Sequence, residues 1–333
     1  MNFRVDRWSA AALRRSRVVL ATVGALLLSS CGGGGQSSQS EQFDPRRMVV
    51  FGDESSLLEP TTPGGNDSRK YTNNGFGPGT TVIDCFNVNR LWVQILADEY
   101  DLVFAECNPN NATPTAQMRA AQGAKVVDVA AAIDVFLALP GNSVGPTDLF
   151  TLMVGTHDIL ELFNSVTLGL PEATAVAELE RRAQLLAAQV DRLTNRNNTR
   201  GRLLYSTVPE VNLTPFGRAQ TGPHQALLKR LTDRFNEELR FQVYDNGRSR
   251  GFLNTAQQMR NVIENPRQAN LTNVTSAVCN VPNLRDLRDC TPATLVAVGA
   301  DATYLWAGDI NFSAVGHFFI ASDAVDLTTS LPW

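Results

Sequence analysis

Short apolar runs alternate along this chain with longer segments in which apolar residues recur at helical spacing. The short runs cover residues 47–51, 148–154 and 202–208 and are typical of buried parallel strands. The longer segments predict helices over residues 87–100, 173–194, 227–243 and 314–327. Strands that alternate with helices of this length require crossover connections. We therefore expect a three-layer α/β/α sandwich with a mainly parallel central sheet.

The first 30 residues have the organisation of an export signal. Five arginines precede an apolar run over residues 18–28, and this run is too short to cross a bilayer, so it predicts a signal peptide. The sequence Leu28-Ser29-Ser30-Cys31 resembles a bacterial lipobox, which implies cleavage before Cys31 and acylation of that residue. An ordinary signal peptide followed by a chance cysteine is the alternative.

Acylation of Cys31 would anchor the protein to a membrane, because two or more acyl chains hold a protein stably on a bilayer. Gly32 stands next to the cysteine in place of an aspartate, which in this class of lipoprotein indicates the outer membrane of a bacterial cell envelope. Residues 31–43 then form the lipidated cysteine and a Gly/Ser-rich tether. Residues 44–333 form a single domain, since no second linker divides them.

The charge balance narrows the range of partners. The chain has a formal net charge of −4, and removal of the leader, which holds five arginines and one aspartate, leaves about −8. No stripe of lysine and arginine is present, so the sequence predicts no nucleic-acid partner. We expect a monomer without a cofactor or a metal.

The four cysteines outside the leader predict two disulfides, because an even number of cysteines in an exported domain is typical of a disulfide framework. Three pairings are possible. We favour Cys85–Cys107 and Cys279–Cys290, because each closes a short local loop. No Cys/His spacing indicates a zinc site.

Several segments, in order and at the expected spacing, resemble the SGNH/GDSL hydrolases, and particularly their outer-membrane and autotransporter esterase branch. These segments are residues 49–53 (VVFGD), 89–102 (NRLWVQILADEYDL), 121–124 (AQGA), 154–159 (VGTHDI) and 304–317. The resemblance extends from about residue 47 to 326. It implies an SGNH/flavodoxin-like sandwich and the hydrolysis of carboxylic esters.

The resemblance also implies a serine nucleophile, a histidine base held by an aspartate, and oxyanion donors from two backbone N–H groups and an asparagine. In this chain Glu54 stands at the nucleophile position and His157 at the asparagine position, whereas the donor glycine is retained as Gly123. Gly308 and Asn311 stand where the family has its aspartate and histidine.

The catalytic histidine is missing in either alignment of the last segment, because anchoring on Asp309 instead places Phe312 at that position. The chain has three histidines, His157, His224 and His317, of which His317 corresponds to a second, supporting histidine of the family. A working triad would have to recruit His157 or His317.

Three hypotheses follow. In the first, which we favour, the domain is a degenerate hydrolase that keeps the pocket and binds a ligand or partner without cleaving it. Glu54, His157 and Asn311 then pack together without a nucleophile–base contact. In the second, Ser55 is a shifted nucleophile of a divergent carboxylic-ester hydrolase that acts on acyl esters or acetylated glycans. In the third, Asp53, Glu54, His157 and Asp309 form a metal-dependent or glutamate-based site.

Overall fold

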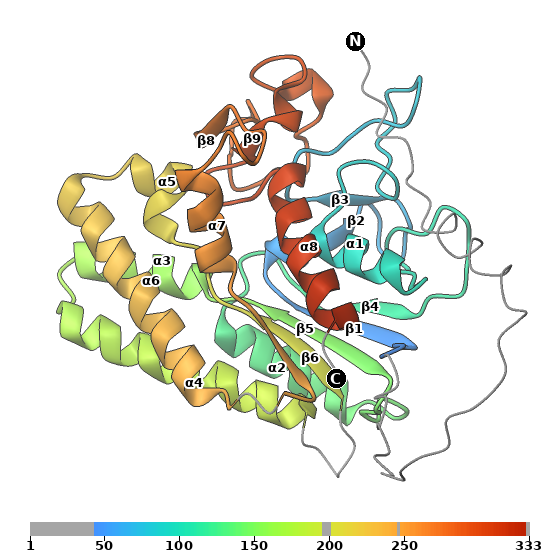
Figure 1. The fold of residues 1–333 in the computed structure, drawn as a ribbon, viewed down its shortest axis with the longest axis horizontal. Coiled ribbons are helices and arrows are strands. Elements are labelled where there is room, and N and C mark those ends of the chain that lie inside the picture. The colour runs from blue at the N-terminus through green and yellow to red at the C-terminus, as the bar shows by residue number, and fades with distance from the viewer. Residues whose placement is uncertain (1–42, 195–200, 245–246, 331–333) are drawn as a thin grey trace, which may run out of the picture. The chain divides into compact units, whose positions relative to one another are not determined.

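The computed structural model describes residues 43–194, 201–244 and 247–330, which all belong to one compact unit. Their centre is a parallel five-stranded sheet in the order β4-β1-β5-β6-β7 (Figure 1). The strands are β1 (Arg47–Gly52), β4 (Ala116–Met118), β5 (Asp148–Met153), β6 (Arg202–Ser206) and β7 (Arg250–Leu253). The leader, Cys31 and the tether predicted for residues 31–42 lie outside the described residues.

Helices cover both faces of the sheet and complete three layers (Figure 1). One face carries α2 (Val126–Ala138), α3 (Thr156–Thr167), α4 (Glu172–Thr194) and α6 (Gly222–Gln242), and the other carries α1 (Trp92–Glu99), α7 (Thr255–Glu264) and α8 (Ala314–Ser330). In β1, Val49 and Phe51 face the first group while Met48 and Val50 face the second, as the alternation of a strand requires. The expected three-layer fold with a parallel sheet is confirmed.

Two small sheets and several short helices surround this sandwich. β2 (Leu58–Pro60) and β3 (Ser68–Lys70) pair antiparallel, and β8 (Asn273–Ala277) and β9 (Tyr304–Trp306) pair parallel. The short helices are η2 (Glu54–Ser56), η4 (Val211–Leu213), α5 (Pro215–Arg218), η5 (Pro292–Thr294) and η6 (Ala300–Ala302). Both predicted disulfides are formed, with Cα–Cα distances of 6.0 Å for Cys85–Cys107 and 5.7 Å for Cys279–Cys290.

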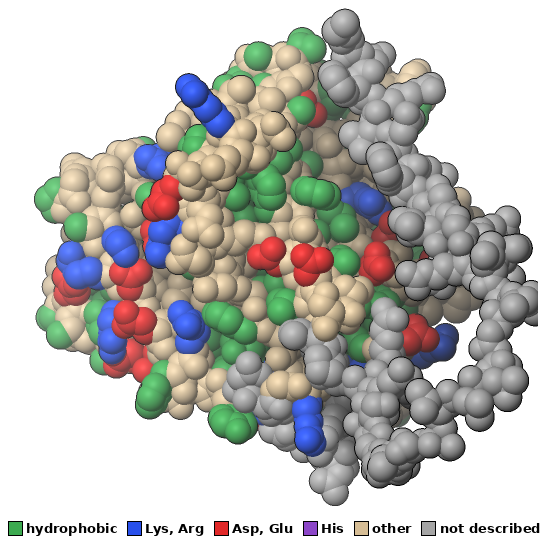
Figure 2. All heavy atoms as spheres, viewed as in Figure 1, with side chains coloured by type: hydrophobic (Ala, Val, Ile, Leu, Met, Phe, Trp, Pro, Cys, Tyr) green, Lys and Arg blue, Asp and Glu red, His purple; other side chains and the backbone are tan. Residues whose placement is uncertain are grey.

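The pattern of apolar residues located the long elements better than their ends. The helix predicted over residues 87–100 begins only at Trp92, because Asn89 takes a left-handed backbone conformation (φ 49°) that interrupts a helix. Ion pairs such as Arg230–Glu172, at 2.7 Å, join α6 to α4, where basic and acidic side chains intermingle on the surface (Figure 2). Among the described helices, none is both long and apolar enough to cross a membrane.

Candidate functional site

The predicted site residues Asp53, Glu54 and His157 lie in the loops that follow β1 and β5. Parallel strands bring their carboxyl ends to one edge of the sheet, which is where such folds bind ligands. Two glycines allow the loops to approach closely. A Cβ on Gly52 would lie 2.4 Å from the Met153 carbonyl oxygen, and a Cβ on Gly155 would lie 2.6–2.7 Å from the side chains of Val208 and Phe235.

Glu54 begins the single turn of η2 and turns its side chain inward, where it is only 3% exposed. Its Oε1 and Oε2 lie 2.7 Å and 2.9 Å from Nε2 of His157, at the start of α3. Oε2 also accepts a hydrogen bond of 2.9 Å from the backbone N–H of Gly123. We call Asp53, Glu54, Gly123 and His157 together the Glu54 site.

Glu54 and His157 form an ion pair. Burial alone would lower the pKa of His157, but the hydrogen bond and the charge of Glu54, with a contribution from Asp53, raise it above its usual value. Burial likewise acts to raise the pKa of Glu54, but the hydrogen bond and charge of His157 and the Gly123 N–H outweigh burial and lower it. The carboxylate and the imidazolium therefore stabilise each other.

Asp53 has the opposite electrostatic situation. It is buried, and its Oδ1 accepts a hydrogen bond of 3.0 Å from the Ser55 N–H, which caps η2. Burial, followed by the charge of Glu54, raises the pKa of Asp53 to about 7, although His157 and Ser55 oppose this shift. A second negative charge is thus disfavoured beside Glu54.

The donors that surround Glu54 are those that the sequence predicted for an oxyanion. Gly123 and His157 stand at two of these donor positions, and both bind the Glu54 carboxylate. The third predicted donor is the backbone N–H at the nucleophile position, which here is the N–H of Glu54 itself. This N–H also lowers the pKa of the Glu54 carboxyl. All three donors therefore stabilise a carboxylate that belongs to the chain.

The last segment contributes less to this site than the sequence suggested. Asp309 accepts a hydrogen bond of 2.9 Å from Nε of Arg285, and Asn311 is buried with its Oδ1 unpaired. Within the described residues, no hydrogen bond or ion pair joins Asp309 or Asn311 to Glu54 or His157. Sequence reasoning missed Arg285 as the partner of Asp309. Arg285 lies 24 residues before Asp309 and belongs to no motif that could have indicated the contact.

Within residues 43–194, 201–244 and 247–330, neither of the remaining histidines is hydrogen-bonded to a serine hydroxyl. His317 is fully buried, and neither ring nitrogen has a partner among the described residues; burial, with the charge of Lys70, lowers its pKa to about 3 and keeps it neutral. The His224 ring packs edge-on against Phe163, with 5.6 Å between ring centroids. With His157 engaged by Glu54, no imidazole in the described part of the chain is hydrogen-bonded to Ser55.

Ser55 itself is half-buried and lines a narrow cleft beside Asp53, together with Thr156, Thr207 and Phe312. The cleft has a volume of about 10 Å³. That is about the space needed for one water molecule. The next hydroxyl, that of Ser56, is buried and accepts a hydrogen bond of 3.1 Å from the Trp92 indole.

A metal-binding arrangement is not formed here. Throughout residues 43–194, 201–244 and 247–330, no three His, Cys, Asp or Glu side chains come together in a way that could hold a metal ion. Glu54 and His157 are close, but Asp309 is directed to Arg285. The residues thus provide a carboxylate–imidazolium pair rather than a set of metal ligands.

No protein-family model and no curated protein sequence matches the chain. Among solved structures, the chain is similar to the lipase Lip_vut3 from a goat rumen metagenome, with a TM-score of 0.47, 11% identity and coverage of 85% of this chain and 97% of that one. A member of the lipolytic protein G-D-S-L family from Veillonella parvula DSM 2008 has a TM-score of 0.41, 13% identity and coverage of 86% and 99%. The extracellular lipase from Streptomyces rimosus has a TM-score of 0.39, 15% identity and coverage of 84% and 99%.

Proposed function

We propose that this chain is a lipid-anchored envelope protein whose esterase-like domain has lost hydrolysis and acts by binding a ligand or a partner. The observation that carries this proposal is the Glu54 carboxylate, which stands at the nucleophile position and takes the hydrogen bonds of the predicted oxyanion donors. A histidine cannot activate a carboxylate for acyl transfer as it activates a hydroxyl.

The energetics of the ion pair support the loss of hydrolysis. An oxyanion could reach the Gly123 and His157 donors only by displacing the Glu54 carboxylate, which already accepts from one and pairs with the other. The cleft next to Ser55, at about 10 Å³, has no room for an acyl group. Both features disfavour an ester substrate at this edge of the sheet.

The envelope location rests on the sequence. A basic and apolar leader, the Leu-Ser-Ser-Cys motif and the polar tether together support lipidation at Cys31. Growth of expressing bacteria with an alkyne-tagged fatty acid tests this. We expect the label on the wild-type protein and its loss in Cys31→Ser, and an unlabelled wild-type protein would contradict the anchor.

The loss of hydrolysis is tested by fluorophosphonate labelling of the full-length protein in mild detergent, followed by peptide mapping in a mass spectrometer. An active serine esterase, labelled in parallel, is the positive control, and near-UV circular dichroism verifies folding. We expect no adduct on this chain. An adduct on Ser55 that disappears in Ser55→Ala would overturn the proposal.

One observation favours hydrolysis by Ser55 as a second candidate function. Ser55 lines the cleft next to Asp53, and the raised pKa of Asp53, about 7, would allow that carboxyl to exchange protons near neutral pH. In this alternative the substrates would be acyl esters or acetylated glycans. The same labelling experiment separates the two functions, because the alternative requires an adduct on Ser55.

A further inference from the structure

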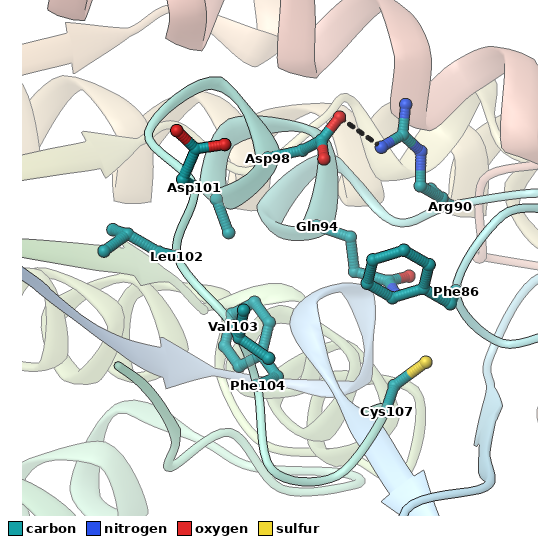
Figure 3. A pocket seen from close by; sticks show the side chains of 10 residues that line it. Phe86, Arg90, Gln94, Asp98, Asp101, Leu102, Val103, Phe104 and Cys107 are labelled. Carbon is teal, nitrogen blue, oxygen red and sulfur yellow. Dashed lines mark hydrogen bonds and ion pairs between the residues drawn. The ribbon is translucent and has the colours of Figure 1, made fainter. Parts of the chain in front are cut away.

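A second cavity lies on α1 and the loop that follows it, and its lining includes none of the residues of the Glu54 site (Figure 3). Its volume is about 240 Å³. Pockets for drug-sized ligands measure about 300–1,000 Å³, so this cavity suits a smaller molecule.

The inner wall of the cavity is apolar and fixed in place. Leu102 and Phe104 form part of it and are 8% and 4% exposed, and Phe86 forms a side wall. The Cys85–Cys107 disulfide joins the segments that carry Phe86 and Phe104. A rigid apolar wall of this kind can hold an aromatic ring or a short hydrocarbon chain by excluding water from it.

The rim of the cavity is charged, with more acid than base. Arg90 Nη1 bonds Asp98 at 2.8 Å, so these two charges compensate each other. Asp101 also stands at the rim, and in the described part of the chain its carboxylate takes part in no hydrogen bond or ion pair (Figure 3). One negative charge therefore remains uncompensated beside the apolar wall.

The backbone holds Asp101 in this position. Its φ of 55° lies in the left-handed region, which aspartate tolerates better than most residues. The Asp101 N–H donates to the Asp98 carbonyl, and the Leu102 N–H donates to the Ala97 carbonyl at 2.9 Å. The turn thus places a carboxylate and a buried leucine side by side.

We propose that this cavity binds a small organic cation, in which a primary ammonium group is attached to an aromatic or aliphatic body. The ammonium group pairs with Asp101, and the body packs on Leu102 and Phe104. The ring of Phe86 adds a further apolar surface to the wall of the cavity. The inference concerns a different part of the molecule from the Glu54 site and holds whether or not Ser55 is reactive.

The test compares phenethylamine with 2-phenylethanol, which has a similar shape but no charge, by calorimetric titration of the full-length protein in mild detergent at low salt. We expect phenethylamine to bind about two- to fivefold more tightly than the alcohol. Asp101→Asn should reduce the affinity for the amine to that for the alcohol. Asp326→Asn, which removes an exposed carboxylate from α8, is the matched control and should change neither affinity.

Equal affinities of the amine and the alcohol, or an amine affinity that survives Asp101→Asn, would overturn the proposal. The absence of binding by both compounds at millimolar concentration would also overturn it. None of these results bears on the fluorophosphonate experiment, which concerns Ser55. A failure of this proposal and a failure of the proposed function are therefore distinguishable.

Discussion

Removal of the Glu54 carboxylate should destabilise the domain by an amount that follows from its contacts. In Glu54→Ala, the Gly123 N–H loses an acceptor at 2.9 Å and His157 loses its partner at 2.7 Å. A buried donor without an acceptor costs about 1–3 kcal/mol. Removal of one partner from a buried ion pair costs about 3–5 kcal/mol. Because the His157 side chain is 18% exposed and can release its proton, we expect a loss of about 3 kcal/mol.

Thermal unfolding of the full-length protein in mild detergent at pH 6, followed by circular dichroism, measures this loss. For a domain of this size, about 3 kcal/mol corresponds to a fall in Tm of about 5 °C. Glu54→Gln is the matched control, because its amide oxygen can still accept the Gly123 N–H, and it should lose less than half as much. Added acetate should raise the Tm of Glu54→Ala, since it can supply the missing carboxylate to both donors.

Two results would refute this reasoning. An unchanged Tm in Glu54→Ala would mean that neither the Gly123 N–H nor His157 depends on the carboxylate. An equal rise in Tm with acetate for the wild-type protein and for Glu54→Ala would mean that acetate acts elsewhere on the molecule. In either case the Glu54 site could not be described as an occupied oxyanion site.

Three further predictions concern the Glu54–His157 pair, the buried His317 and Gly155. The Glu54–His157 pair should stabilise the wild-type protein relative to Glu54→Gln most strongly between pH 4.5 and 6.5. The contribution of Glu54, whose pKa is lowered, is lost as pH falls below that window, and the contribution of His157, whose pKa is raised, is lost as pH rises above it; Tm against pH measures both. His317 has a pKa of about 3 in the folded protein, against an ordinary value of 6.5, so between these pH values the unfolded state binds more protons than the folded state. The free energy of unfolding should therefore fall by up to about 1.4 kcal/mol per pH unit as the pH drops below 6.5. His317→Leu should flatten this slope in urea titrations. Gly155→Ala should lower the free energy of unfolding by about 3 kcal/mol, because the new Cβ would lie 2.6–2.7 Å from neighbouring side chains and the backbone φ is +129°. Gly222→Ala, whose Cβ would have no neighbouring atom within 4 Å, is the control and should have little effect in the same titration.

The sequence predicted those features that depend on local pattern. Strands β1, β5 and β6 are continuous apolar runs, and the long helices α4 and α6 carry apolar residues at helical spacing. The two disulfides were predictable because each closes a short loop. By contrast, β7 has only four residues, and its place at the sheet edge depends on pairing with β6 rather than on its own composition.

The arrangement of side chains at the site could be predicted only in part. A parallel sheet brings the ends of β1 and β5 together, so the proximity of Glu54 and His157 follows from the topology. The direction of Asp309 does not, because a loop has no periodicity and the Arg285 guanidinium determines where that carboxylate lies. For the same reason the sequence could not indicate that the cleft beside Ser55 is nearly filled.

The residues at positions 54 and 157 explain each other better than either does alone. A carboxylate buried against a neutral asparagine would have an uncompensated charge, which is strongly unfavourable in a protein interior. An imidazolium offsets that penalty, because its hydrogen bond and charge lower the pKa of Glu54 against the effect of burial. The compensation extends to one negative charge only, because the neighbouring Asp53 has its pKa raised to about 7. An anionic ligand at this edge of the sheet would therefore meet the His157 imidazolium, which Glu54 already neutralises, and the Asp53 carboxyl, which resists ionisation. We therefore expect the binding function of the protein to lie elsewhere on its surface.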